Sequence, residues 1–253
     1  MVEAAGLSLR FSGLVAFALA LVSGPVRAEE GHHHPVVWVG LHLEQDLAFA
    51  SGTDVCTKDS QLNEGFACFR SSGSQYHGTP RVGVRDNVDS GLLVATTRML
   101  LSGDYALSDS VTLGARAGYV LRGGGPTPDG GKPFIPYHLE GRASLWLLGQ
   151  SYGDAGIQPF LFAGGGLAQV DGSLEVVVAE DANAPPPPNQ PDNPPTQTLD
   201  VYKKAGSGFA KVGVGAYTAI GEHHGAVLEL GAMQLFPSSG TAIALSLGYV
   251  LGV

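Results

Sequence analysis

Thr241 to Val253 reads TAIALSLGYVLGV, and its residues alternate between two kinds of side chain. The even-numbered positions carry small or short residues. The odd-numbered positions carry apolar residues or threonine, namely Thr241, Ile243, Leu245, Leu247, Tyr249, Leu251 and Val253. Because successive side chains of a β-strand point to opposite faces, this alternation predicts a strand with one apolar face and one slim face.

The same alternation recurs in seven earlier segments, each long enough to cross the hydrocarbon layer of a membrane as a tilted strand. In one of them we expect Leu93 and Ala95 on the apolar face, and in another Phe160 and Phe162. The segments are residues 36–49, 92–105, 111–122, 136–148, 158–170, 208–220 and 226–236. The sequence therefore predicts eight strands.

The connections between these segments differ in length in a regular way. Residues 50–91 and 171–207 form long connections, whereas residues 106–110 and 221–225 form tight turns. Long loops at one end and short turns at the other are typical of outer-membrane β-barrels.

On this pattern and the C-terminal strand, residues 36–253 resemble the small eight-stranded outer-membrane β-barrels, a group similar to the transmembrane domain of outer membrane protein A. The resemblance implies an all-β fold, an eight-stranded antiparallel up-and-down transmembrane β-barrel, in contact with outer-membrane lipid. It also implies that the barrel-assembly machinery recognises the C-terminal strand. The residues of that signal are Ser246, Gly248, Leu251 and Val253, although many such barrels end in Phe or Trp.

The main alternative is a secreted, lipocalin-like barrel with its apolar faces turned inward. In that fold the basic residues of the alternating segments, such as Arg98 and Arg116, would lie outside.

Residues 1–28 have the anatomy of a secretory signal peptide. Arg10 precedes an apolar run over residues 11–24, and Val26-Arg27-Ala28 provides a small-residue cleavage site. The run of 14 residues is shorter than the ~20 that a membrane-spanning helix needs. We therefore expect export with cleavage, a mature chain of residues 29–253 and a location in the Gram-negative outer membrane; an uncleaved N-terminal anchor is the alternative.

The composition excludes one class of partner and supports the membrane interpretation. Charged residues make up 15% of the chain, against ~25% in a typical soluble domain. Without residues 1–28 the chain holds 12 basic and 22 acidic residues, so we expect no binding to nucleic acid.

Cys56 and Cys68 are the two cysteines of the chain and lie in a polar segment rich in glycine and serine. An even pair this close in an exported protein predicts one disulfide that closes a small surface loop.

Charged residues fall on the slim face of the predicted strands, and hence inside the barrel. They are Glu44, Arg98, Arg116, Glu140, Arg142, Lys211 and Glu229. Because an eight-stranded barrel is only wide enough for its own side chains, we expect these residues to pair and to plug the lumen. The alternative is a gated pore built from the same network.

The long connection after the fifth strand is acidic over residues 171–203 and rich in proline over residues 183–195. We expect it to be extended and disordered or polyproline-like. It is then either a solvated surface loop or a recognition loop for a partner or a divalent cation.

The sequence lacks the spacing of known enzyme motifs, and we predict no enzyme, cofactor or metal. His77, His138 and Glu140 show no triad spacing, and the runs His32–His34 and His223–His224 lack a fixed coordination geometry. The function predicted is a non-enzymatic outer-membrane β-barrel that anchors surface loops for envelope structure or for interaction with a surface or envelope protein. The alternative is a narrow channel or transporter for small or hydrophobic solutes.

Overall fold

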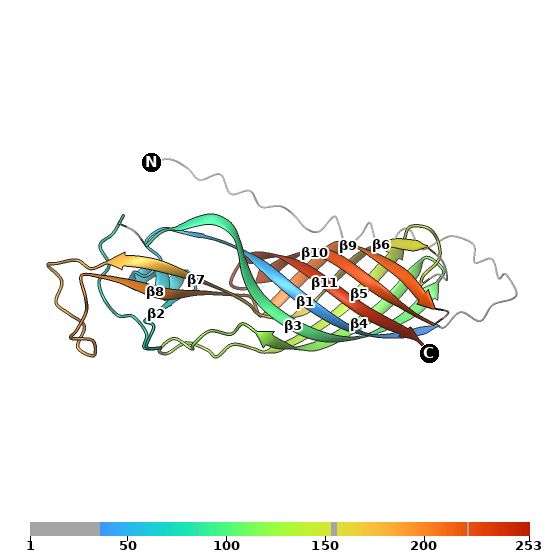
Figure 1. The fold of residues 1–253 in the computed structure, drawn as a ribbon, viewed down its shortest axis with the longest axis horizontal. Coiled ribbons are helices and arrows are strands. Elements are labelled where there is room, and N and C mark those ends of the chain that lie inside the picture. The colour runs from blue at the N-terminus through green and yellow to red at the C-terminus, as the bar shows by residue number, and fades with distance from the viewer. Residues whose placement is uncertain (1–35, 85, 153–155, 222) are drawn as a thin grey trace, which may run out of the picture. The chain divides into compact units, whose positions relative to one another are not determined.

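A computed structural model describes residues 36–84, 86–152, 156–221 and 223–253; the predicted signal peptide and His32–His34 lie outside these ranges. Eight antiparallel strands close a barrel, in which β11 pairs with β1 (Figure 1). They are β1 (Val37–Gly52), β3 (Val88–Ser108), β4 (Val111–Arg122), β5 (Tyr137–Trp146), β6 (Ile157–Leu167), β9 (Gly208–Gly221), β10 (His224–Phe236) and β11 (Gly240–Gly252). The predicted eight-stranded fold is confirmed.

The barrel is apolar outside and charged inside. Leu101 is 65% exposed and Leu247 is 61% exposed, whereas Arg98 is fully buried. A wall of this kind suits a barrel surrounded by lipid. The lipocalin-like alternative, with apolar side chains inside and basic ones outside, is therefore wrong.

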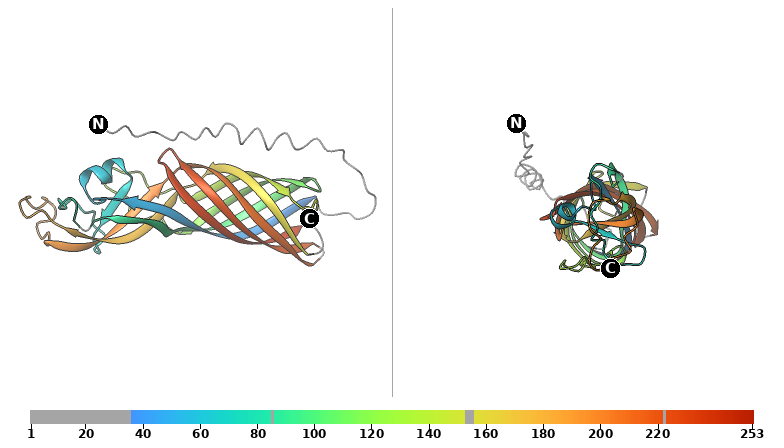
Figure 2. Two further views of the ribbon diagram at one scale, coloured as in Figure 1. Left: turned by 90° about the horizontal axis from the view of Figure 1, so that it is seen from above. Right: turned by 90° about the vertical axis from the view of Figure 1, so that its left-hand side faces the viewer.

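The long connections contain secondary structure that the sequence analysis did not predict. A second sheet combines β2 (Phe66–Phe69), β7 (Val170–Ala179) and β8 (Thr196–Ala205) in the order β2-β8-β7, beside a short helix, α2 (Lys58–Asn63). This sheet continues from the end of the barrel where the long connections lie (Figures 1 and 2). We call residues 53–87, 123–135 and 170–205 the cap. Within the described ranges, every helix is too short or too polar to cross a membrane.

The expectation that residues 171–203 are disordered or polyproline-like is wrong for residues 171–179 and 196–203, which lie in β7 and β8. β7 and β8 form a regular hairpin in which Val176 pairs with Leu199. Proline has no amide hydrogen to donate to a sheet, and the proline-rich stretch accordingly occupies the connection between the two strands.

The cap has a hydrophobic core of its own. Both cysteines lie in this core, and so do residues from the three cap strands. Its members include Val55, Cys56, Phe66, Cys68, Tyr76, Val178, Leu199 and Val201. The cap is therefore a folded unit and not a set of solvated loops.

The predicted side-chain directions are wrong at two places in the barrel wall. Between the pairs Gln45–Thr97 and Leu47–Val94, β3 advances three residues while β1 advances two. This bulge reverses the phase of β3, so Ala95 is buried and Val94 is exposed.

The side chains of β6 also point in the direction opposite to the prediction. Phe160 and Phe162 are 3% and 4% exposed and point into the lumen, while Leu161 faces outward. Both phases of this strand are largely apolar, and Gln158 is the one polar residue that shares the inward phase with Phe160 and Phe162.

Candidate functional site

The middle of the lumen holds a pair of arginines around one carboxylate. Arg116 of β4 donates two hydrogen bonds to Glu229 of β10, at 2.7 and 2.8 Å. Arg142 of β5 forms a second ion pair with Glu229 at 3.0 Å. All three residues are at most 6% exposed, so two buried arginines share the Glu229 carboxylate.

A second group of charges connects β1, β3, β5 and β9. The Nζ of Lys211 donates to Glu44 at 2.6 Å and lies 3.9 Å from Glu140. Arg98 binds Asp46 and lies 3.9 Å from Glu44. The structure thus brings all seven sequence-predicted lumen residues together inside the barrel.

His138 links the basic and acidic members of this network. An Nη of Arg98 lies 2.7 Å from Nδ1 of His138, and Nε2 of His138 lies 3.1 Å from Glu140. Because arginine only donates, Nδ1 is the acceptor and Nε2 carries the proton that is donated to Glu140.

Sequence reasoning missed Asp46 and His138 as members of the network. Asp46 follows Glu44 in the even-numbered phase of the first strand, so extending the alternation by one step would have identified it. His138 shares the strand phase of Glu140 and Arg142, so the alternation of that segment would have identified it as well.

Apolar layers fill the lumen on both sides of the charges. Toward the short turns, Trp38 stacks on Tyr152 with ring centroids 4.4 Å apart, and Trp146 lies 4.7 Å from Phe160. Toward the cap, a second cluster contains Phe209, Met233 and Leu235 among others.

Little free space remains between these layers. Arg142 lies over the ring of Phe162 at 4.2 Å, so the inward phenylalanines pack on the charges. A lumen cavity beside His42, Asp104 and Glu229 has a volume of about 10 Å³, room for about one water molecule. The described side chains therefore form a plug with an ionic centre and two apolar ends.

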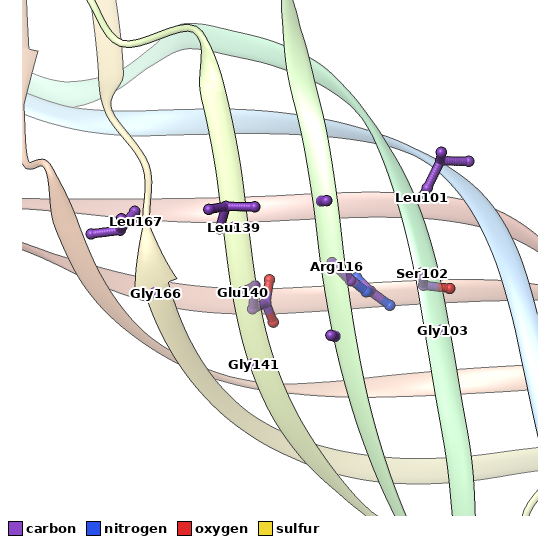
Figure 3. Close-up of a pocket in the computed structure, with 11 residues that line it drawn as sticks. Leu101, Ser102, Gly103, Arg116, Leu139, Glu140, Gly141, Gly166 and Leu167 are labelled. Atoms are coloured by element: carbon purple, nitrogen blue, oxygen red, sulfur yellow. The ribbon is translucent and has the colours of Figure 1, made fainter.

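The outer wall of the barrel is apolar at positions that neighbour the charged lumen residues in sequence. In Figure 3, Leu101, Leu139 and Leu167 project from the wall, while Arg116 and Glu140 belong to the opposite face. These leucines line a shallow groove of about 640 Å³ on the barrel exterior.

The disulfide predicted between Cys56 and Cys68 is present in the cap, with an S–S distance of 2.01 Å. Both cysteines are fully buried. The bond links the segment before α2 to β2.

Polar contacts tie the connections of the cap to one another. Arg70 donates to Gln190 in the proline-rich connection at 2.8 Å, and the Tyr76 hydroxyl donates to Glu180 at 2.5 Å. Burial and the Glu180 carboxylate raise the pKa of Tyr76. The proline-rich stretch is thus held against the rest of the cap.

The residues considered for catalysis have separate partners. His77 pairs with Asp129 in the cap at 3.0 Å, while His138 and Glu140 belong to the lumen network. Among the residues that the structure describes, no three His, Cys, Asp or Glu side chains gather as a metal site.

The C-terminal strand places Ser246 inside the barrel and leaves Leu251 and Val253 exposed.

No family model matches the sequence, and no curated protein matches it. Among solved structures, the chain is similar to Neisserial surface protein A, with 9% identity and a TM-score of 0.40, over 86% of this chain and 97% of that one. It is also similar to the N-terminal β-barrel domain of Pseudomonas aeruginosa OprF, with 11% identity and a TM-score of 0.33, over 84% and 97%. The attachment invasion locus protein Ail of Yersinia pestis aligns with 6% identity and a TM-score of 0.35, over 86% and 98%. At these scores, the description of the fold rests on the strand pairing of this chain.

Proposed function

We propose that this protein is an outer-membrane barrel, closed to solutes, that displays the cap at the cell surface for envelope structure or for contact with a surface or envelope protein. One observation carries the proposal: the lumen is filled from end to end, while the cap has a separate core. The packed side chains of the lumen stabilise the barrel and leave no passage through it. The cap is then the part of the molecule that can contact a partner.

The location in the Gram-negative outer membrane belongs to the same proposal. The apolar exterior suits contact with lipid, and the predicted signal peptide would deliver the chain across the inner membrane. The C-terminal residues Ser246 to Val253 would then be recognised by the assembly machinery. The proposed role requires no catalytic residue, cofactor or metal.

Surface labelling tests the orientation. A cysteine placed at Val82, which is 70% exposed in the cap, should react with a membrane-impermeant maleimide on intact cells. A cysteine at Asp109, exposed in the short turn between β3 and β4, is the matched control and should react only after the outer membrane is opened. Labelling of Asp109→Cys alone on intact cells would overturn the proposal.

The second candidate function is a narrow channel. The observation in its favour is the small polar cavity beside Asp104 and Glu229, which rearranged side chains could extend. Purified protein in planar bilayers separates the two functions, because the plug predicts no discrete conductance steps. Steps that disappear in a variant blocked inside the barrel would establish the channel instead.

A further inference from the structure

A pocket of about 680 Å³ lies in the cap between the loop 123–135 and the three-stranded sheet. Its volume is within the range of roughly 300–1,000 Å³ that is typical of small-molecule sites. Tyr202 and Lys204 of β8 contribute to its floor, and Pro126, Lys132 and Phe134 contribute to the loop side. Tyr202 alternates with Val201 of the cap core, so the pocket uses the sheet face turned away from that core.

The loop is held in place over the sheet. Asp171 of β7 is 6% exposed, and its carboxylate accepts a hydrogen bond from the backbone amide of Gly125 at 2.5 Å. A Cβ atom at Gly125 would lie 2.1 Å from the ring of Tyr202, so the loop backbone rests directly on that ring. The pocket is therefore formed before any ligand arrives, which lowers the entropic cost of binding.

The charged side chains that are exposed at the pocket are positive. The Nζ of Lys204 donates to the carbonyl oxygen of Lys132 at 2.5 Å, and an ammonium group has three donor protons. Lys132 itself is exposed, whereas the Asp171 carboxylate is buried and engaged by Gly125. Two lysines thus border one pocket of a chain that has 14 basic and 23 acidic residues.

The walls of the pocket are suited to the uncharged part of a ligand. Phe134 and Tyr202 provide aromatic surface, and the prolines of the loop provide rigid apolar surface. A flat apolar group can pack against these side chains while an attached anion meets the lysines. We propose that this pocket binds a small organic anion, specifically an aromatic carboxylate. This activity goes beyond the display of the cap and does not depend on whether the lumen conducts.

The test uses the full mature chain, folded in detergent micelles, and 2-naphthoate as the probe. We expect saturable binding in a ligand-detected NMR titration. The double variant K132Q/K204Q should weaken binding by about fivefold or more, within the range expected for the loss of two exposed ion pairs. Lys58→Gln, which removes the same charge from exposed α2, is the matched control and should bind like the wild type.

A second probe separates charge recognition from partition into the micelle. The cation 2-naphthylmethylammonium has the same ring system and should bind more weakly than 2-naphthoate. The proposal is overturned if 2-naphthoate shows no saturable binding, if K132Q/K204Q binds it as tightly as K58Q does, or if the cation binds equally well. Because both lysines lie at the surface of the pocket, retained disulfide formation and unchanged β-sheet circular dichroism will show that the variants remain folded.

Discussion

The barrel buries charged side chains and exposes apolar ones, whereas the core of the cap is apolar. In the barrel, Arg98 and Lys211 are inside and leucines cover the exterior; in the cap, Val178 and Leu199 are inside. The two regions belong to one chain and differ in their surroundings, because lipid accepts apolar side chains that water would drive inward. The comparison teaches that a charged residue stabilises the barrel only from within, whereas the cap carries charge on its surface at little cost.

The largest effect is expected from Glu229→Ala in the lumen. This change leaves Arg116 and Arg142 buried without the carboxylate that they share. Removal of one partner from a buried ion pair costs about 3–5 kcal/mol, and the free energy of unfolding of the barrel should fall by that amount. Urea unfolding in detergent, followed by the gel mobility of unheated samples, measures it. Glu175→Ala on the exposed face of the cap is the control, and equal losses in the two variants would contradict the distinction between the regions.

Leu43→Arg should have the next largest effect. Leu43 is 52% exposed near the middle of β1, and an arginine facing lipid near the midplane costs about 2–4 kcal/mol. We expect the variant to accumulate in unfolded form, measured by the heat-modifiable fraction in purified membranes. Leu62→Arg, at a cap residue that is 71% exposed, should assemble like the wild type. Normal assembly of Leu43→Arg would show that this face does not meet lipid.

Replacement of both cysteines by serine should weaken the cap alone. Cys56 and Cys68 are 12 residues apart, and a bond that closes a loop of this size contributes about 3 kcal/mol, mainly by restricting the unfolded chain. Amide hydrogen exchange should accelerate in β2 and β8, while β4 and β10 of the barrel keep their protection. Equal acceleration in both regions would mean that the barrel and the cap unfold as one cooperative unit.

The sequence predicted the barrel well because lipid outside and a packed lumen inside impose strict alternation on every strand. The prediction failed where that alternation failed: a bulge reversed β3 at Ala95, and β6 is apolar in both phases around Phe160. Alternation also identified the inward charges but not their partners, since pairs such as Lys211 with Glu44 are set by the register of distant strands.

The cap could not be predicted in the same way. β2 is four residues long with every residue buried, so it shows no alternation. The β7–β8 hairpin surrounds a proline-rich connection whose composition is typical of disordered chain. Its strands are ordered by a core shared with residues more than 100 positions earlier, such as Val55 and Phe66, and local patterns do not reveal a contact of that range.

The smallest effect is expected on the way in which the stability of the cap depends on pH. Burial, with the nearby carboxylate of Asp54 as a smaller contribution, raises the pKa of Asp86 from 3.8 to about 6. Folded Asp86 therefore binds its proton more tightly than unfolded Asp86 does, and its contribution to stability is complete below pH 4 and is lost as the pH rises through 6. Asp86→Asn resembles the protonated form of Asp86 at every pH. The contributions of other titrating groups to the pH dependence of stability therefore cancel when the variant is compared with the wild type.

Between pH 4 and pH 5 the wild-type cap should lose about 1 kcal/mol relative to Asp86→Asn, the change expected from a two-unit pKa shift over that interval. Hydrogen exchange of the cap strands at the two pH values, corrected for the intrinsic exchange rate, measures this difference, and the barrel strands serve as the internal reference. A difference between variant and wild type that does not change from pH 4 to pH 5 would show that Asp86 is ionised in the folded cap, with a partner that compensates its burial. The cap would then resemble the barrel lumen, because both would hold a buried charge that is stabilised by a partner. The difference between the charged lumen and the cap would be smaller than the apolar core of the cap indicates.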